Sequence, residues 1–384
     1  MANRVLPPDA LDTHEPRYPL KVVFCSQCSL VQLTETVSPE VLFRDYVYFS
    51  SVSDTVLAHS KAHADELVAR LNLGPKSMVV EVASNDGYLL QYVQAHGVPV
   101  LGVEPARNIA AVANDRGVPT TDRFFGLQTA TALHAEGVRA DALLGNNVLA
   151  HVADLNGFVA GAALLLAEGG IVEFEFPYVV DLVDHLEFDT IYHEHLCYFS
   201  AHSIDALFAR HGLVLTDVQH LDIHGGSLRV TAATTVHPQG RARVDALLAE
   251  ESSRGVHTHA FYRCFASRVQ KLGADLVRLL KDLRANGKRV AAYGASAKGA
   301  TLLNYFGVDS KLIEYVVDRS PAKQGLFTPG THLPILPTTT LADDAPDFAL
   351  LLTWNFQAEI AQQQAEWRHG GGRFIVPVPH VHIV

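Results

Sequence analysis

The chain has 384 residues, of which 48% are hydrophobic and 18% charged, and its formal net charge is −11. This length allows two or three domains, and this composition is typical of a globular protein rather than a disordered or fibrous one. The negative charge and the scattering of the 30 Lys and Arg residues argue against a nucleic-acid surface. Because the sequence shows no signal-peptide core and no apolar run long enough to span a bilayer, we expect a cytoplasmic protein without a membrane partner.

Four cysteines are too few for a disulfide scaffold in a chain of this size. Cys25 and Cys28 form a C-x-x-C, which is half of a zinc-ribbon-like set of ligands. A metal site and two reduced structural thiols both remain open for this pair. Cys197 and Cys264 lie far along the sequence in apolar surroundings, where buried thiols are expected.

An aromatic stretch at residues 43–51 follows two short expected strands at residues 20–24 and 30–33. Its rings stand beside hydroxyl groups, including that of Tyr46, which fits a lid over a pocket as well as ordinary core packing. Apolar residues at helical spacing then predict a helix over residues 53–71.

The most informative stretch is residues 79–93, which reads as a strand, a tight turn and a helix. The turn carries the polar and small residues Glu81, Ser84, Asn85, Asp86 and Gly87. Glu104 ends the next strand at the spacing where nucleotide-binding units place a carboxylate against ribose. Since the turn has acids and no phosphate-binding glycine motif, it suits a ligand with an ammonium or sulfonium group, namely S-adenosylmethionine. The alternative is an ordinary turn between a strand and a helix.

Strands and helices continue to alternate after this turn, which predicts a doubly wound α/β sheet over residues 55–235. Expected helices cover residues 108–116, 127–136 and 156–167, and expected strands cover residues 98–103, 118–121, 140–145 and 171–176. The strand at residues 140–145 runs into Asn146, Asn147 and His151. These side chains should reach the same carboxyl edge as Glu81 and Glu104, where open α/β sheets bind their ligands.

A dense polar stretch follows at residues 184–200 and contains Tyr192, His193, Glu194 and His195. The spacing H-E-H differs from the H-E-x-x-H of zinc proteases, so a zinc protease site is not indicated. Histidine beside a carboxylate and a phenol is suited to moving a proton near neutral pH. Structural histidines are the alternative, because the chain has 20 histidines in all.

The remainder of the chain predicts a helical bridge and a second, smaller α/β domain. A strand pair at residues 214–221 and 227–235 is joined through His224, and residues 243–286 are mainly helical and amphipathic. Residues 289–301 repeat the strand, turn and helix, but with Lys298 in place of the acids, so this turn suits a phosphate. Further strands are expected at residues 312–318 and 348–354. The expected domains are residues 1–54, 55–240, 241–286 and 287–384.

These motifs together resemble the S-adenosylmethionine-dependent C-methyltransferases of nucleotide-linked deoxysugars, notably the C-3-methyltransferases of TDP-4-keto-6-deoxyhexoses in antibiotic pathways. The resemblance spans nearly the whole chain and is carried by the C-x-x-C, residues 41–50, 81–87, 192–195, 224–229 and the turn at residues 294–301. The family has an earlier C-x-x-C in an N-terminal zinc module, and this sequence is expected to begin after it. Residues 1–54 would then be a truncated module with Cys25 and Cys28 as half of a zinc site.

The resemblance implies a site and a reaction. His195 would be the general base, with Glu194, Tyr192 and Tyr46 as its catalytic neighbours. The residues implied to face the methyl donor are Glu81, Ser84, Asn85, Gly87, Glu104, Asn146, Asn147 and His151. Tyr293, Lys298, His224 and Ser227 are expected to bind the substrate, a small-molecule TDP-4-keto-deoxysugar that is methylated at the carbon next to its ketone. The alternatives are an O- or N-methyltransferase and an inactive binding homologue, and we expect a monomer.

Overall fold

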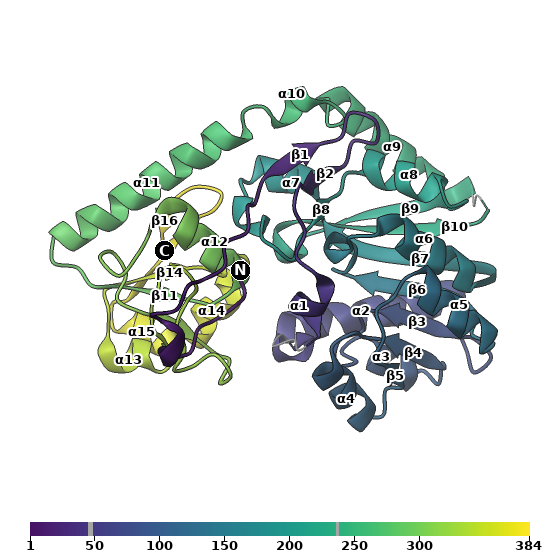
Figure 1. Ribbon diagram of the computed structural model, residues 1–384, viewed down its shortest axis with the longest axis horizontal. Coiled ribbons are helices and arrows are strands. Elements are labelled where there is room, and N and C mark those ends of the chain that lie inside the picture. The colour runs from purple at the N-terminus through teal and green to yellow at the C-terminus, as the bar shows by residue number, and fades with distance from the viewer. Residues whose placement is uncertain (45–48, 236–237) are drawn as a thin grey trace.

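The computed structural model describes residues 1–44, 49–235 and 238–384 as two α/β lobes (Figure 1). The larger lobe is built on a seven-stranded sheet and the smaller on a six-stranded sheet. The N-terminal segment, purple in Figure 1, lies between the two lobes, and the long helix α11 runs along the smaller one. The expected pair of Rossmann-like units is therefore confirmed.

The larger sheet has the strand order β5-β4-β3-β6-β7-β10-β9. Its strands are β3 (Val79–Val82), β4 (Val100–Val103), β5 (Thr120–Thr121), β6 (Ala140–Asn146), β7 (Leu166–Pro177), β9 (Val214–Leu221) and β10 (Ser227–Ala233). Strands β5, β4, β3, β6 and β7 are parallel, whereas β10 is antiparallel to both of its neighbours. The doubly wound sheet is confirmed, and β7 begins five residues earlier than the expected strand at residues 171–176.

Helices cover both faces of this sheet because its central strands are buried on both sides. The helices are α2 (Asp54–Leu71), α3 (Leu90–Ala95), α4 (Arg107–Asp115), α5 (Leu127–Ala135), α6 (Leu155–Leu165) and α8 (Ala201–Ala209). Helices α2 and α3 share one apolar core with Val79 and Leu144, while α5, α6 and α8 share another with Val80 and Phe174. Alternating residues of the same strands thus face opposite cores.

A buried polar layer joins α2 to the sheet. His63 Nε2 lies 2.6 Å from Glu173 Oε1, and the Arg229 guanidinium lies 2.9 Å from Glu175 Oε2. Partners surround both carboxylates, which offsets the cost of burying them and holds the pKa of each at about 2. The layer fixes α2 over β7 and β10, and so fixes the chain that enters β3.

The smaller sheet has the order β13-β12-β11-β14-β15-β16, and only β16 is antiparallel to its neighbour among these strands. Its elements are β11 (Val290–Tyr293), α12 (Ala297–Phe306), β12 (Val316–Asp318), β13 (Ile335–Pro337), α13 (Thr340–Asp344), β14 (Phe348–Leu351), η6 (Trp354–Phe356), α14 (Gln357–Gln363), α15 (Ala365–His369), β15 (Arg373–Val376) and β16 (His382–Ile383). Two expected strands are shorter than predicted. The strand at residues 312–318 begins only at Val316, and the strand at residues 348–354 ends at Leu351, so that Trp354 opens a 3₁₀ turn instead.

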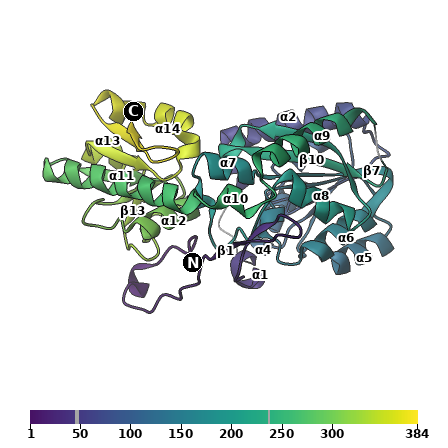
Figure 2. The same cartoon turned by 90° about the horizontal axis from the view of Figure 1, so that it is seen from above.

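A small third sheet of order β1-β2-β8 lies against the larger lobe. It contains β1 (Val22–Phe24), β2 (Val31–Leu33) and β8 (Cys197–Tyr198). The remaining elements are η1 (Pro8–Ala10), α1 (Pro39–Phe43), η2 (Ser50–Val52), η3 (Leu149–His151), α7 (Val179–Asp184), η4 (Phe188–Thr190), η5 (Ile223–Gly225), α9 (Pro238–Arg254), α10 (His259–Tyr262) and α11 (Phe265–Ala285). The first residues of the chain run along the smaller lobe (Figure 2), where Leu6 bridges to Phe327 and Glu15 bonds to His332.

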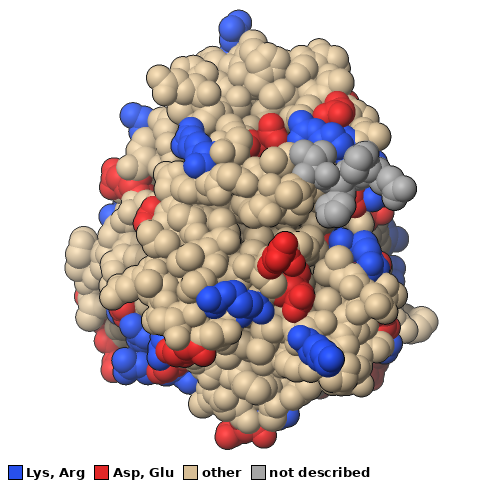
Figure 3. Space-filling model, turned by 90° about the vertical axis from the view of Figure 1, so that its right-hand side faces the viewer, with Lys and Arg blue, Asp and Glu red and all other residues tan. Residues whose placement is uncertain are grey.

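Charged side chains of both signs are interspersed on the face of the larger lobe shown in Figure 3. No helix among the described residues combines the length and the apolar character needed to cross a bilayer.

Candidate functional site

The turn after β3 is locked to the end of β4 by one carboxylate. Glu104 Oε2 accepts the Asn85 N–H at 2.9 Å, and Glu104 Oε1 accepts the Ala106 N–H at 2.8 Å. The turn has positive φ at Asn85 (48°) and Gly87 (78°). This backbone conformation places the predicted donor-binding residues of both strands at one sheet edge, as expected.

Several polar groups at this edge are buried in a way that fits a polar ligand. Within the described part of the chain, Ser84 Oγ and Asn146 Oδ1 are buried without a hydrogen-bond partner. A Cβ atom at Gly102 would lie 2.4 Å from Ser84 Oγ, so the glycine makes room for this hydroxyl. Burial, reinforced by the nearby Glu104 carboxylate, raises the pKa of Glu81 well above its usual range. Orphaned polar atoms in such a cradle are the groups that a nucleoside ligand would satisfy.

Asp86 does not add a free negative charge to the turn. Its buried carboxylate lies 2.9 Å from Arg116 Nη1 and also accepts from Ser51 Oγ. The neighbouring Ser50 N–H donates to Asn85 Oδ1 at 2.9 Å. The chain that follows residue 48 is thereby fastened to the turn, and the expectation that Asp86 attracts a cationic ligand is not supported by this pairing.

His195 and Tyr192 form the hydrogen-bonded pair at the centre of the polar stretch. The Tyr192 hydroxyl lies 2.8 Å from His195 Nε2, and His195 Nδ1 lies 2.9 Å from the Thr190 carbonyl oxygen. A carbonyl oxygen only accepts, so Nδ1 carries the proton and the Nε2 of a neutral imidazole is the basic nitrogen. The Thr190 carbonyl thus orients the imidazole, and Nε2 is the nitrogen that could accept a proton.

His151, in the 3₁₀ turn η3 that follows β6, contacts the ring of His195. Its ring centroid lies 4.8 Å from that of His195, with the planes at 79°, and 5.4 Å from that of Phe43. Desolvation lowers the pKa of His151 to about 4, so its ring is neutral at physiological pH. Leu196 N–H donates to the Ala150 carbonyl at 2.7 Å, which ties the two segments together. The two regions, which are separate in the sequence, therefore lie side by side.

The second turn lies at the carboxyl edge of β11, beside β14. Gly294 has φ +96°, and a Cβ atom there would lie 2.6 Å from Thr353 Oγ1. Ser296 Oγ accepts the Gly299 N–H at 3.0 Å and caps α12. Within the described residues Lys298 Nζ is buried without a hydrogen-bond partner and lies 4.7 Å from the centroid of the Trp354 ring.

The other predicted substrate residues have different surroundings. Tyr293 is buried in the core of the smaller lobe with its hydroxyl 3.5 Å from Gln363 Oε1. Ser227 is fully buried, and its hydroxyl donates to the Ile223 carbonyl at 3.1 Å. Tyr46 and the side chain of His224 lie outside the described residues. The contacts of Tyr293 and Ser227 are those of structural residues.

Cys25 and Cys28 face each other in the loop between β1 and β2. Hydrogen bonds from Cys28 and from the Gln27 backbone lower the pKa of Cys25. Across the described residues, no group of three or more His, Cys, Asp or Glu side chains is placed to hold a metal ion. The residues present therefore do not fit a four-ligand structural zinc site. Of the remaining thiols, Cys197 is buried as expected, and its pKa is raised to about 12 by burial and by Cys28, whereas the prediction for Cys264 was wrong because it is exposed.

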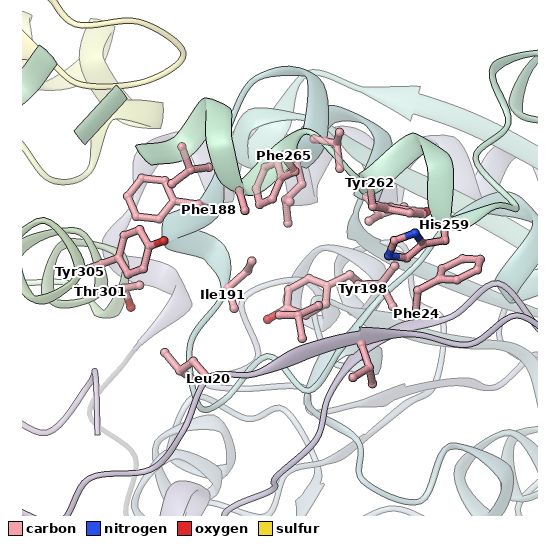
Figure 4. A pocket seen from close by; sticks show the side chains of 18 residues that line it. Leu20, Phe24, Phe188, Ile191, Tyr198, His259, Tyr262, Phe265, Thr301 and Tyr305 are labelled. Atoms are coloured by element: carbon pink, nitrogen blue, oxygen red, sulfur yellow. The ribbon is translucent and has the colours of Figure 1, made fainter. Parts of the chain in front are cut away.

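An apolar cavity of about 380 Å³ lies beside the polar stretch at residues 184–200 (Figure 4). Ile191, Tyr198 and Phe188 line it from the larger lobe, and Phe24 and Tyr305 line it from β1 and α12. The Tyr198 hydroxyl donates to the His195 carbonyl at 2.8 Å. Ile191 and Tyr198, on either side of His195 in the sequence, thus pack around an apolar cavity.

Sequence reasoning missed the group that orients His195. The acceptor is the backbone carbonyl of Thr190, and a backbone carbonyl cannot be recognised from the type of residue that carries it. Asp189 and Glu187 were visible only as acids in a polar stretch, although both are buried. Trp354 was assigned to a strand, although it reaches across to Asp189. The only hint of this contact in the sequence is that Trp354 follows an apolar run as an isolated tryptophan.

Comparisons with known proteins identify similar chains. Three family profiles match: "Putative zinc binding domain" over residues 1–43, "Methyltransferase domain" over residues 57–218 and "C-methyltransferase C-terminal domain" over residues 222–379. C-methyltransferase NovU of Streptomyces niveus is 38% identical over 371 residues, which cover 96% of this chain and 88% of NovU.

Two solved structures resemble about half of this chain, and only distantly. Magnesium protoporphyrin IX methyltransferase ChlM of Synechocystis PCC 6803, with bound SAM, is 15% identical with a TM-score of 0.35, covering 50% of this chain and 86% of ChlM. An S-adenosylmethionine-dependent methyltransferase of Clostridium acetobutylicum is 8% identical with a TM-score of 0.36, covering 46% of this chain and 91% of that protein. Both likenesses are too remote to bear on activity.

Proposed function

This chain belongs to the family of S-adenosylmethionine-dependent C-methyltransferases, and we propose that its acceptor is a TDP-4-keto-deoxysugar in antibiotic deoxysugar biosynthesis. His195 removes the proton from the carbon next to the ketone, at C-3 of the sugar, and this carbon then receives the methyl group. The observation that carries the proposal is the 2.8 Å contact between the Tyr192 hydroxyl and His195 Nε2 at the edge that also holds His151.

An imidazole alone is too weak a base for a proton next to a ketone. Proton removal therefore needs a donor that stabilises the negative charge developing on the ketone oxygen. The resting Tyr192 O–H donates to His195 Nε2, because Nδ1 carries the imidazole proton. Nε2 has one lone pair, so the Tyr192 O–H must turn away before Nε2 can take the proton from the carbon, and the released hydroxyl then donates to the developing enolate oxygen.

The imidazolium that forms is stabilised from its other side. The Thr190 carbonyl oxygen, 2.9 Å from Nδ1, accepts a stronger hydrogen bond when the ring is charged. The neutral His151 ring places no positive charge beside the imidazolium, since desolvation keeps its pKa at about 4. Together these contacts favour the protonated form of the base while the carbon is being methylated.

The residues at the first turn fit the methyl donor. Ser84, Asn146 and the carboxylate of Glu104 offer polar atoms to its adenosine and methionine portions at one sheet edge. When bound, S-adenosylmethionine supplies an electrophilic methyl group. The chain's own part is to hold the donor and acceptor in line, which turns methyl transfer into a reaction between fixed groups.

The smaller lobe is proposed to hold the nucleotide end of the substrate. The turn at residues 294–299 lies where its strand order reverses between β11 and β14, a common ligand position in open α/β sheets. The buried Lys298 ammonium and the N-terminus of α12 suit a phosphate there. In this proposal the enzyme acts as a cytoplasmic monomer on a small molecule, without nucleic acid or membrane.

Incubation with S-adenosylmethionine and a panel of TDP-4-keto-deoxysugars tests the proposal. Mass spectrometry should find one added methyl group, and NMR should place it on the carbon next to the ketone. A methyl group found on oxygen or nitrogen would show a different acceptor class. No methylation of any keto sugar, with S-adenosylmethionine bound, would reject the sugar substrate.

A further inference from the structure

We propose that Trp354 of the smaller lobe is a positioning residue for His195 and acts through the 3₁₀ turn η4. The Trp354 Nε1–H donates to Asp189 Oδ2 at 2.7 Å. Asp189 directly precedes Thr190, whose carbonyl oxygen accepts the proton of His195 Nδ1 at 2.9 Å. One indole of the smaller lobe is thus joined to the base of the larger lobe through two hydrogen bonds and one peptide unit. The inference rests on the proposed role of His195.

The Asp189 bond is directional and buried, so it restrains the turn more sharply than packing does. Phe188, in the same turn, packs on Phe306 with ring centroids 4.7 Å apart and on Tyr305 at 5.6 Å. Such ring contacts hold the turn against α12 but tolerate sliding and rotation. Asp189 has no exposed surface, so a lost indole donor cannot be replaced by bulk water without opening the turn.

Electrostatics favour the same arrangement. The ammonium of Lys298 lies over the Trp354 ring at 4.7 Å and is the leading charge that opposes the effect of burial on the Asp189 carboxyl group. The indole therefore contacts a cation through its face and a carboxylate through its N–H. Both contacts fix the plane of the indole and hence the position of Asp189.

The chemical consequence concerns which nitrogen of His195 is protonated. The Thr190 carbonyl selects the Nδ1–H form, which leaves Nε2 as the base. If the turn moves and this acceptor is lost, the proton is no longer held on Nδ1, and the fraction with a basic Nε2 falls. Trp354 should therefore affect proton removal more than the binding of S-adenosylmethionine.

The matched pair of variants is Trp354→Phe and Trp367→Phe. Trp367 belongs to the same lobe and donates its Nε1–H to the Pro346 carbonyl at 2.9 Å, away from η4. Histidine labelled with ¹⁵N reports the tautomer of each imidazole, and a His195→Asn sample identifies the His195 signals. We expect Trp354→Phe to lower the Nδ1–H population of His195, and Trp367→Phe to leave it unchanged.

Kinetics provide the second readout. Trp354→Phe should lose about tenfold to a hundredfold in kcat, the scale expected when a reacting group is misplaced, with an unchanged Kd for S-adenosylmethionine. Asp189→Leu removes the other partner of the same bond, so the double variant should lose no more than the more severe single variant. Losses that multiply, or an unchanged His195 tautomer in folded Trp354→Phe, overturn the inference. If the wild-type enzyme methylates no keto sugar while Trp354→Phe still changes the His195 tautomer, the proposed substrate is rejected and the positioning role stands.

Discussion

The Nδ1 atom of His195 lies 2.9 Å from the carbonyl oxygen of Thr190, five residues earlier in the same loop. This backbone acceptor takes the place that a carboxylate fills in many catalytic triads. A carbonyl has no net charge, so it orients the imidazole without raising its basicity as much as an ionised acid would. The basic nitrogen Nε2 is consequently turned toward Tyr192, and proton removal depends on how firmly the loop is held.

The first prediction concerns His195 and its neighbour His193. We expect His195→Asn to lose roughly 10²–10⁴-fold in kcat, the usual scale of general-base catalysis, while both ligands still bind. His193→Asn is the matched control, because His193 contacts the Ala2 N–H at 3.2 Å and the Tyr18 carbonyl at 3.1 Å rather than the pair. Exchange of the substrate's α-hydrogen in deuterated water follows proton removal directly. A His195→Asn enzyme that exchanges and methylates at the wild-type rate rules out His195 as the base.

The second prediction places the methyl donor at the turn after β3. Gly87 and Gly97 have nearly the same φ, 78° and 76°, but an added Cβ would lie 2.9 Å from Val118 at Gly87 and in open space at Gly97. Gly87→Ala and Gly97→Ala therefore carry similar backbone strain, and only the first displaces the turn. Calorimetry should show weaker S-adenosylmethionine binding for Gly87→Ala relative to Gly97→Ala. Equal affinities would place the donor elsewhere.

The third prediction tests the proposed role of Lys298. Removing a cation that pairs with phosphate weakens the ground state and the transition state alike, so Lys298→Met should raise KM for the sugar nucleotide, whatever its loss from the Trp354 ring does to kcat. Lys271→Met is the control, since Lys271 lies on α11 with its side chain 78% exposed. Steady-state kinetics with the sugar nucleotide as the varied substrate decide the matter, and an unchanged KM in Lys298→Met contradicts the assignment.

The fourth prediction concerns pH and the buried acid Glu187. Burial raises the pKa of Glu187 to about 7 against the lowering effect of Lys298, whereas the usual value is 4.5. Between these values the folded protein holds a proton that the unfolded chain has lost. The stabilising contribution is therefore complete below pH 4.5 and is lost as the pH rises through 7, by at most about 1.4 kcal/mol per pH unit.

Glu187→Gln should remove this dependence. Relative to wild type, the free energy of unfolding of the variant should increase as the pH rises from 4.5 to 7, as measured in urea. The exposed Glu136→Gln serves as the control, because the Glu136 side chain is 55% exposed. A difference between wild type and Glu187→Gln that stays constant with pH would mean that Glu187 is ionised throughout the range.

Much of this architecture follows from sequence pattern, and the exceptions have physical causes. Alternating apolar runs and small-residue turns predict both sheets, since a parallel strand buried on both faces reads as a short apolar block. The same pattern overextends the strand that ends at Leu351, because the apolar run continues as far as the 3₁₀ turn at Trp354. The spacing of apolar residues shows which residues are buried, but it does not show where a strand ends, because turns and loops in a core are buried as well.

The site was predicted to a similar extent. Residues at the ends of strands, such as Glu104 and Asn146, lie at one sheet edge as expected, because parallel strands end at the same edge. Contacts between elements distant in sequence were not predicted. The contact between His151 and His195 depends on the path of the loop, and the bond between Trp354 and Asp189 depends on how two lobes meet.

Strand β2, near the start of the chain, pairs with β8 directly after the catalytic loop, in a register that joins Val31 to Tyr198 and Gln32 to Cys197. During synthesis β2 emerges long before its partner, so this pairing closes a very long loop. Contacts of such high sequence separation form late and slowly. In refolding experiments we therefore expect catalytic activity to return after most of the helical circular-dichroism signal, because the base acquires its final surroundings only when the two distant segments meet.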